Sequence, residues 1–229
     1  SAIIPVSNAC SIISGTTTTF AAQSTGTPNS SRITVVSLTW SDSTVANTAE
    51  ILDVTVGGTS LARAIRAAGD DQSSNSEIWW FQNPSGTSAN IVVTASTAID
   101  AMIVQTYSLV GFGSVSPVAT ATGTTAVAQP YNNKQGVIEV VSRRINVSTT
   151  LSNVTTDLST ACGPVLWGVH AHERLNGNNQ TLNSAISPTS NTPLIATAVW
   201  ALAPNALCVQ SGLNFSINCN MIYVPALIH

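Results

Sequence analysis

The string His170-Ala171-His172-Glu173 is the stretch of this chain whose residue types and spacing come nearest to a reactive site. If the string lies on a β-strand, alternate residues share a face, so the two histidines could offer their imidazoles to one metal ion. Such a site needs at least a third ligand, and Glu173 would point to the opposite face of the strand. We therefore assign no metal-binding residue and expect a histidine pair at a strand end, facing solvent or a subunit contact.

The ten carboxylates are scattered along the chain, and most fall in or beside turn-like segments. A glycosidase needs two carboxylates about 5 to 9 Å apart in a cleft, and the sequence pattern predicts no such pair. Asp70-Asp71 lacks the alternating oxygen ligands of a calcium loop. The sequence also contains no G-x-S-x-G elbow and no glycine-rich phosphate loop. We assign no catalytic residue, no cofactor-binding residue and no cofactor, and we expect a protein that is not an enzyme.

Trp79, Trp80 and Phe81 form an aromatic run that could stack on sugars. Neighbouring strand residues face opposite sides, so at most one of the two tryptophans faces outward unless the sheet is covered on both sides. We expect a core position for either ring rather than a sugar-binding platform.

The four cysteines, Cys10, Cys162, Cys208 and Cys219, lie far apart and form neither a C-x-x-C pair nor a zinc-like cluster. Their even number allows two disulfides, and buried free thiols are an equal alternative. Cys208 and Cys219 are close enough in sequence to close a small terminal loop. The sequence leaves the state of all four open.

The elements that must position these residues are short segments of alternating apolar residues separated by turn sequences. In 32–40, Val36, Leu38 and Trp40 share one face, and Gly57-Gly58 joins 51–56 and 59–65 as a hairpin. Further strands are expected at 77–82, 91–95, 102–110, 137–141, 165–171 and 195–202. About nine strands without a helical segment predict an all-β fold, an antiparallel β-sandwich. The residues expected to point into its core are Val36, Leu38, Trp40, Val104 and Trp200.

Hydroxyl groups, rather than ions, carry the polarity of the chain. Serine and threonine make up 58 of the 229 residues, whereas charged residues make up 7 %, against about 25 % in ordinary globular proteins. Lys134 is the one lysine, and because lysine is depleted in interfaces, this favours an exterior covered by partner subunits. A secreted protein with a hydroxyl-rich exterior is an equal alternative. The net charge of −3 argues against a nucleic-acid partner, and no apolar run approaches the roughly 20 residues that span a bilayer.

Residues 16–204 resemble a sandwich module that recurs in bacteriophage virion proteins and in large secreted bacterial surface proteins. The resemblance lies in the order of six strings, which are RITVVSLTWSD at 32–42, VTVGGTSLARAI at 54–65, EIWWFQNPSGTSANIVVTAS at 77–96, SLVGFGSVSPV at 108–118, HERLNG at 172–177 and ATAVWALAP at 196–204. It implies a jelly-roll-like fold with a structural or adhesive role and no shared catalytic residues. The terminal flanks have no counterpart in the module.

The resemblance divides the chain into an N-terminal arm, residues 1–15, a β-sandwich domain, residues 16–204, and residues 205–229, which form a second arm or extra strands. The expected function is that of a non-enzymatic structural component of a bacteriophage particle, a capsid decoration (cement) protein or a head-fibre, vertex or tail component. Its partners would be the major capsid or other virion proteins and further copies of itself, and its location the virion. The alternative is a secreted carbohydrate-binding or adhesion module of a bacterial surface protein, with a cell-surface glycan as partner. Neither involves nucleic acid or a membrane.

Both flanks are apolar for free tails, and such a composition would invite aggregation unless it were buried. We therefore expect each flank to lie against its own sandwich, as extra strands, or against a neighbouring chain, as an arm. The apolar residues concerned are Ile3, Ile4, Val6, Ile12 and Ile13 at the front and Leu213, Phe215, Ile217, Met221, Ile222, Tyr223 and Val224 at the back.

Overall fold

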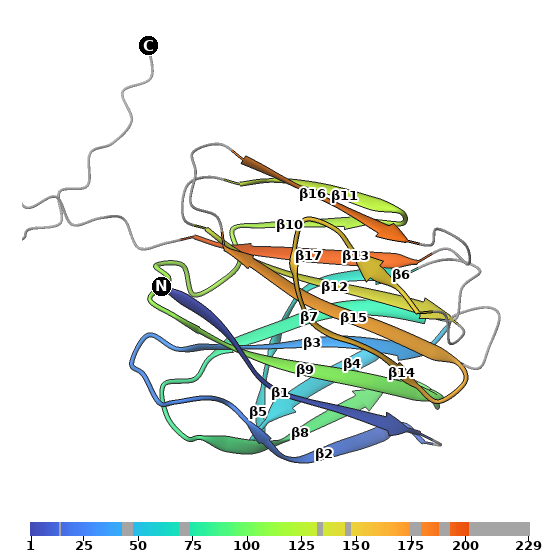
Figure 1. The fold of residues 1–229 in the computed structure, drawn as a ribbon. Coiled ribbons are helices and arrows are strands. Elements are labelled where there is room, and N and C mark those ends of the chain that lie inside the picture. Colours follow the sequence, from blue (N-terminus) through green and yellow to red (C-terminus); the bar gives the residue numbers. More distant parts are fainter. Residues whose placement is uncertain are drawn as a thin grey trace, which may run out of the picture.

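In the computed structural model the regular elements are all β-strands, 17 in number (Figure 1). The structure describes residues 1–13, 15–42, 48–68, 74–131, 135–144, 148–174, 180–187 and 193–201. The strands are β1 (Ala2–Ile12), β2 (Thr17–Ser24), β3 (Ile33–Ser41), β4 (Ile51–Val56), β5 (Thr59–Ser60), β6 (Ala62–Ala68), β7 (Ser74–Gln82), β8 (Ser88–Ala95), β9 (Ala101–Val110), β10 (Ala119–Gly123), β11 (Ala126–Tyr131), β12 (Gly136–Arg144), β13 (Thr150–Leu151), β14 (Thr155–Cys162), β15 (Leu166–Arg174), β16 (Gln180–Ser187) and β17 (Leu194–Trp200). No helix of the length and apolarity that a bilayer crossing requires occurs in these ranges.

The strands form four antiparallel sheets that lie on one another as layers (Figure 1). Sheet I has the order β2-β8-β4-β5, sheet II β1-β9-β3-β7-β6, sheet III β10-β17-β12-β15-β14, and sheet IV β11-β16-β13. One apolar cluster fills the space between sheets I and II, a second lies between II and III, and a third between III and IV. The prediction of an all-β antiparallel sandwich is confirmed, and the stack has more layers than a simple sandwich.

The strands in the middle of the stack are covered on both faces. Every residue of β3 is buried, because Val36, Leu38 and Trp40 face sheet I while Ile33 and Val35 face sheet III. The same holds for β17. The five predicted core residues, Val36, Leu38, Trp40, Val104 and Trp200, are all fully buried, so that prediction is confirmed.

The predicted hairpin at Gly57-Gly58 is present between β4 and β5. Both glycines have positive φ, 59° and 83°, as a tight primed turn requires at its two central positions. The strands that the sequence pattern did not reveal are β1, β2, β10, β11, β13, β14 and β16.

The N-terminal flank is a strand of the fold. Strand β1 pairs with β9 from Ala2, opposite Val110, to Ile12, opposite Ala101, and forms one edge of sheet II. Of the two alternatives for this flank, an extra strand is therefore the one found. Residues 205–229, with Cys208 and Cys219, lie outside the described residues.

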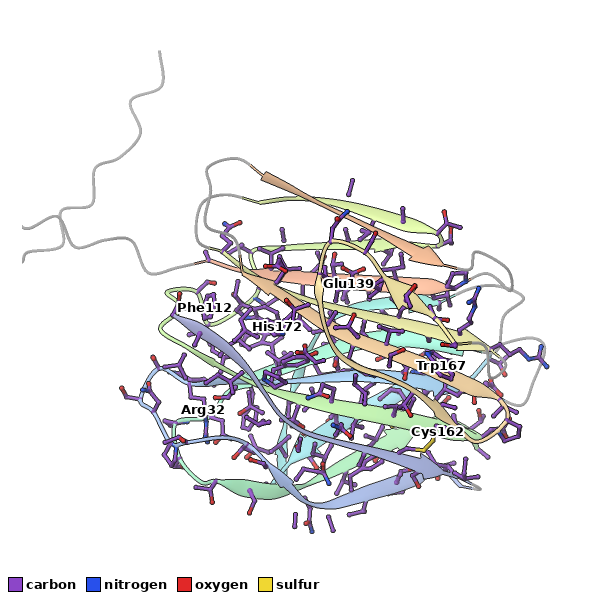
Figure 2. The ribbon with its side chains drawn as sticks, viewed as in Figure 1. Arg32, Phe112, Glu139, Cys162, Trp167 and His172 are labelled. Atoms are coloured by element: carbon purple, nitrogen blue, oxygen red, sulfur yellow. A yellow bond between two sulfur atoms is a disulfide. The ribbon has the colours of Figure 1, made fainter. Side chains whose placement is uncertain are left out.

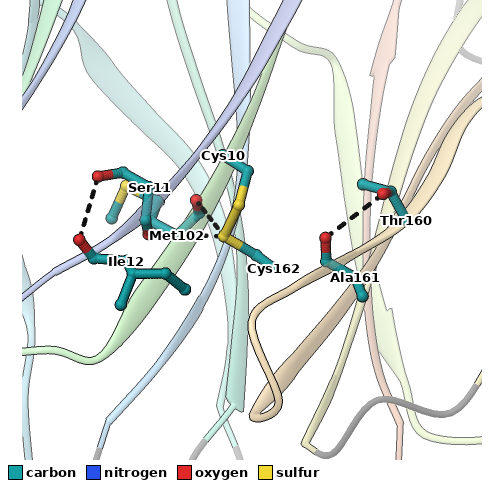
Figure 3. The surroundings of a disulfide bond; sticks show 7 residues. All are labelled: Cys10, Ser11, Ile12, Met102, Thr160, Ala161 and Cys162. Carbon is teal, nitrogen blue, oxygen red and sulfur yellow. Dashed lines mark hydrogen bonds between the residues drawn. A yellow bond between two sulfur atoms is a disulfide. The ribbon is translucent and has the colours of Figure 1, made fainter.

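A disulfide between Cys10 and Cys162 joins the edges of sheets II and III (Figure 3). Cys10 lies on edge strand β1 of sheet II, and Cys162 lies on edge strand β14 of sheet III. Their Cα atoms are 5.8 Å apart and 152 positions apart in sequence. This side of the stack is closed covalently, and the opposite edges of the same two sheets are β6 and β10.

Arg32 fixes the loops at one end of the stack (Figure 2). Its guanidinium is fully buried and donates to four backbone carbonyls, those of Asn83 at 2.5 Å, Gly26 at 2.8 Å, Gly86 at 2.9 Å and Ser85 at 2.5 Å. Burial lowers the pKa of Arg32. The four carbonyls take the place of water around the charge, so the turn before β8 is held to the start of β3.

Candidate functional site

The two histidines of the predicted reactive string lie on one face of β15, as expected, but this face is turned to sheet II. His170 contacts Ser37 on β3, and His172 packs edge-on against Tyr107 on β9, with ring centroids 6.3 Å apart. The expectation that the pair faces solvent or a subunit contact is therefore wrong for His170, which is fully buried, whereas the His172 side chain is 19 % exposed. His170 is buried because sheet III is covered on both faces, by sheets II and IV.

His170 is fully buried between sheets II and III. Its Nδ1 lies 2.7 Å from the Ser37 hydroxyl oxygen, which in turn lies 3.3 Å from the Gln105 carbonyl oxygen. The Nε2 atom is buried and makes no hydrogen bond with the described residues. Burial lowers the pKa of His170 to about 3, so the imidazole is neutral at pH 7.

Gly168 allows the sheets to approach closely beside this histidine. A Cβ at this position would lie 2.5 Å from the Thr39 hydroxyl oxygen and 2.8 Å from the Ile103 Cδ1. The Thr39 hydroxyl and the Gln105 side-chain carbonyl are also buried without a hydrogen bond among the described residues. Polar atoms thus gather in a closely packed region between the sheets, where a bulky substrate has no access.

We expect His170 to make the protein less stable in acid. Its folded-state pKa of about 3 lies below the ordinary value of 6.5, so the unfolded chain takes up a proton here as the pH falls through 6.5, while the folded protein does not. The stability is fully present above pH 6.5 and is lost toward pH 3, by about 1.4 kcal/mol per pH unit. At pH 4.5 the free energy of unfolding should be about 3 kcal/mol below its neutral value through this residue alone.

Urea unfolding at pH 7.0 and pH 4.5, for the wild type and for His170→Asn, measures this effect. Asparagine keeps an amide near the position of Nδ1 and removes the titrating group, so the difference between the two pH values should shrink by about 3 kcal/mol. The loss of unfolding free energy caused by the smaller asparagine side chain is the same at both pH values, so it cancels when the two pH-dependent differences are compared. An equal pH dependence in both proteins would contradict the assignment.

Tyr107, Asp157 and His172 form a second polar group in the same inter-sheet region. The Tyr107 hydroxyl donates to the Asp157 carboxylate at 2.9 Å, and the His172 Nδ1 lies 2.7 and 2.9 Å from its two oxygens. Asp157 reaches this position because it is the extra residue of a bulge, where β14 shifts register against β15 between Thr156 and Leu158.

This arrangement connects strands of two sheets. Tyr107 belongs to β9 of sheet II, whereas Asp157 and His172 belong to β14 and β15 of sheet III. Burial, with the neighbouring Asp157 carboxylate, raises the pKa of Tyr107 well above 10, so its hydroxyl remains a hydrogen-bond donor to the carboxylate. The carboxylate is thus engaged by both neighbours, and the group stabilises the packing of the sheets.

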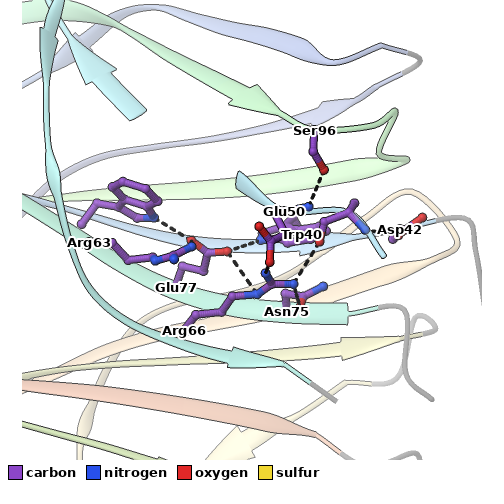
Figure 4. A network of polar contacts seen from close by, with 10 residues as sticks. Trp40, Asp42, Glu50, Arg63, Arg66, Asn75, Glu77 and Ser96 are labelled. Atoms are coloured by element: carbon purple, nitrogen blue, oxygen red, sulfur yellow. Dashed lines mark hydrogen bonds and ion pairs between the residues drawn. The ribbon is translucent and has the colours of Figure 1, made fainter. Parts of the chain in front are cut away.

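Glu77 is the centre of a third polar group, between sheets I and II (Figure 4). Its fully buried carboxylate accepts from the Trp79 Nε1 at 2.8 Å and the Trp40 Nε1 at 3.2 Å. Arg66 and Arg63 pair with it at 3.6 and 3.8 Å, and each guanidinium also covers one of the two indole rings. Burial raises the pKa of Glu77, and Arg66 opposes that shift most strongly.

The aromatic run divides between a core and the surface. Trp79 is buried toward sheet I, whereas Trp80 is half-buried and packs against the core between sheets II and III. Trp80 also lines a surface groove of about 320 Å³ between the edge strands β6 and β10. The other lining residues are Ala62, Arg63, Ala64, Ser116, Pro117, Val118, Ala119 and Thr120.

Sequence reasoning did not find Tyr107, Asp157 or Arg32, because their partners are distant in the chain and no local motif joins them. Asp70, Asp71 and His229 lie outside the described residues. Within the described ranges, no three His, Cys, Asp or Glu side chains gather as a metal-binding group. Comparison of the chain with protein-family models, curated proteins and solved structures gives no match.

Proposed function

We propose that this chain is a non-enzymatic structural component of a bacteriophage particle, a capsid decoration protein or a head-fibre, vertex or tail component. It binds the particle surface through the outer side of its β1 edge. The resemblance of residues 16–204 to virion sandwich modules and the low lysine content motivate the proposal.

The observation that carries it is the apolar, covalently fixed edge strand β1. Ile4 and Ile12 on this strand are 46 % and 63 % exposed, and large apolar side chains on an exposed edge mark interaction sites. The Cys10–Cys162 disulfide holds β1 to sheet III, so a partner meets a preformed surface and less free energy is spent on ordering it.

The disulfide also supports a location outside a reducing cytosol. Disulfides persist on virion and cell surfaces and in secreted proteins. The surface of a particle released from its host meets this condition. Of the two cysteines in the bond, Cys10 is exposed to solvent and Cys162 is buried.

Gradient-purified phage particles from the source of this chain provide the test. We expect mass spectrometry to find the protein at a fixed ratio to the major capsid protein, and added purified protein to sediment with particles that lack it. An Ile4→Asp/Ile12→Asp double variant should bind at least about tenfold more weakly, whereas Leu52→Asp, on the outer sheet I, should bind normally. Absence of the protein from particles, or full binding by the double variant, would overturn the proposal.

A secreted carbohydrate-binding or adhesion module is the second candidate, and the half-exposed Trp80 in the groove favours it. Trp80 lines the groove together with Ser116 and Thr120, so an aromatic ring and hydroxyl-bearing residues share it. Retention of the isolated protein on a polysaccharide column, lost in Trp80→Ala, would support this function and not the first.

A further inference from the structure

The space between sheets II and III is apolar in one part and polar in another. The apolar part is the core cluster that contains Tyr107 and Trp200. In the polar part, six buried side-chain atoms have no hydrogen-bond partner among the described residues, and these are Thr39 Oγ1, Ser41 Oγ, Ser74 Oγ, Gln105 Oε1, Ser142 Oγ and His170 Nε2. Folded proteins contain few such atoms, because each one costs free energy when it is left without a partner. Six of them in one region therefore indicate a polar ligand.

The four atoms that sheet II contributes are neighbours on its face toward sheet III. Thr39 and Ser41 share the face of β3 on which Ser37 contacts sheet III, because alternate strand residues point the same way. Ser41 lies opposite Ser74 of β7, and Ser37 lies opposite Gln105 of β9. Directly opposite side chains in an antiparallel pair have Cβ atoms about 4.5 to 5.5 Å apart. The four atoms thus belong to one polar patch of sheet II.

Gly168 lies where this patch meets sheet III. Ser142 is opposite Gly168 in the β12–β15 pair, and it shares with Val140 the face of β12 that packs toward sheet II. A Cβ on Gly168 would lie 2.5 Å from Thr39 Oγ1 and 3.4 Å from His170 Nε2. Three of the six atoms therefore lie around Gly168, which contributes no side chain of its own.

We infer that an ordered water molecule binds beside Gly168, between sheets II and III. It forms hydrogen bonds with His170 Nε2 and with the hydroxyl groups of Thr39 and Ser142. Because the Thr39 and His170 atoms lie within 3.4 Å of one point, a single water with hydrogen bonds of about 3 Å can reach both. Buried waters typically make about three hydrogen bonds, to polar groups that lack other partners. The inference does not depend on the proposed function.

The surroundings favour water over other polar ligands. The sheets approach closely at Gly168, and one water needs room only for a sphere of about 1.4 Å radius. A metal ion would require further charged or imidazole ligands, and the described ranges hold no group of three His, Cys, Asp or Glu side chains. Water both donates and accepts, so it pairs with His170 Nε2 in either tautomer, while Ser37 engages Nδ1. Both nitrogens of the buried ring then have a partner.

Two measurements on the full-length protein test the inference. A high-resolution crystal structure locates the water, and oxygen-17 magnetic relaxation dispersion in solution counts the long-lived internal waters. We expect a density peak about 2.5 to 3.2 Å from His170 Nε2 and from the two hydroxyl oxygens. Thr39→Val, which keeps the shape of the side chain and removes its hydroxyl, should lose this peak and show one long-lived water fewer.

Thr25→Val is the matched control. Thr25 is also buried, but its hydroxyl donates to the Gly86 carbonyl at 3.4 Å, so this substitution should leave the number of long-lived waters unchanged. Ser142→Ala removes the third partner of the water and should weaken the peak. Cooperative urea unfolding verifies that each variant is folded, and Ser142→Ala provides the test if Thr39→Val does not fold.

Three results would overturn the inference. A wild-type map without a peak beside Gly168 means that the region is dry and that the side chains pair with one another. An equal number of long-lived waters in the wild type and in Thr39→Val means that no water depends on this hydroxyl. A peak surrounded by six or more oxygen atoms at about 2.0 to 2.6 Å assigns the position to a metal ion.

Discussion

Removal of the Cys10–Cys162 disulfide in a Cys10→Ser/Cys162→Ser double variant is expected to lower the free energy of unfolding by about 5 kcal/mol. The bond closes a loop of 152 residues, and in the chain-entropy description a longer loop restricts the unfolded chain more strongly. The total stability of a domain is about 5 to 15 kcal/mol, so the loss is a large share of it. Guanidinium unfolding of both proteins under oxidising conditions measures the change.

Reduction provides an independent control. A phosphine reductant should destabilise the wild type by a similar amount, because Cys10 is exposed and gives the reagent access to the bond. The double variant should be unaffected by the same treatment. A loss of less than 1 kcal/mol in the double variant would contradict the prediction, and a further loss on its reduction would assign part of the stability to the other two cysteines.

Trp40→Ala is expected to cost about 3 to 5 kcal/mol of unfolding free energy. The indole is fully buried between sheets I and II, and its N–H donates to the buried Glu77 carboxylate at 3.2 Å. The substitution leaves a cavity and removes the indole ring that the Arg66 guanidinium covers. It also removes one of the hydrogen-bond donors to the Glu77 carboxylate. Urea unfolding at pH 7 measures the cost.

Two further variants separate the contributions. Trp40→Phe keeps a six-membered aromatic ring but loses the pyrrole part of the indole with its N–H, so it should cost less than Trp40→Ala and leave the Glu77 carboxylate with one donor fewer. Trp167→Ala removes the same side chain from a half-buried position on β15 and should cost less than Trp40→Ala. A cost below 1 kcal/mol for Trp40→Ala would mean that this ring does not anchor the core.

The alternation of apolar residues predicted the strands of the core, but it did not predict that a further sheet packs on the second face of these strands. In β3 the pattern identified Val36, Leu38 and Trp40 as one buried face, and the structure agrees. The other face carries Ser37 and Thr39, which in a two-layer sandwich would face water, yet both are fully buried. A period of two identifies a face of a strand, but it does not reveal a third layer lying on the polar side.

The abundant hydroxyl groups explain how that polar face can be covered. Ser37 contacts His170, and the Ser76 hydroxyl donates to the Leu194 carbonyl at 2.8 Å, in each case across the space between sheets II and III. Hydroxyls are small and can satisfy their hydrogen bonds inside a protein. Part of the serine and threonine content that was expected at the exterior therefore belongs to the interior.

The polar groups of the site depend on features that no local pattern carries. Asp157 meets His172 because of a one-residue bulge in β14, and a one-residue change in register moves a side chain to the other face of a strand. The pairing of Cys10 with Cys162 follows from the meeting of two sheet edges. Four cysteines allow three connectivities, and their spacing does not distinguish among them.

The position of β17 in the stack determines when the apolar face between sheets II and III can be fully buried during synthesis. Strand β17 lies between β12 and β10 in sheet III and completes the cover of the face that β3 and β7 turn toward that sheet. β3 ends at Ser41 and β17 ends at Trp200. At a synthesis rate of roughly 5 to 20 residues per second, β17 is therefore completed roughly 8 to 32 s after β3, and this face stays uncovered until then. During this interval a ribosome-bound chain exposes an apolar sheet face to other nascent chains. We therefore expect chaperones that bind this face during translation to raise the yield of folded protein.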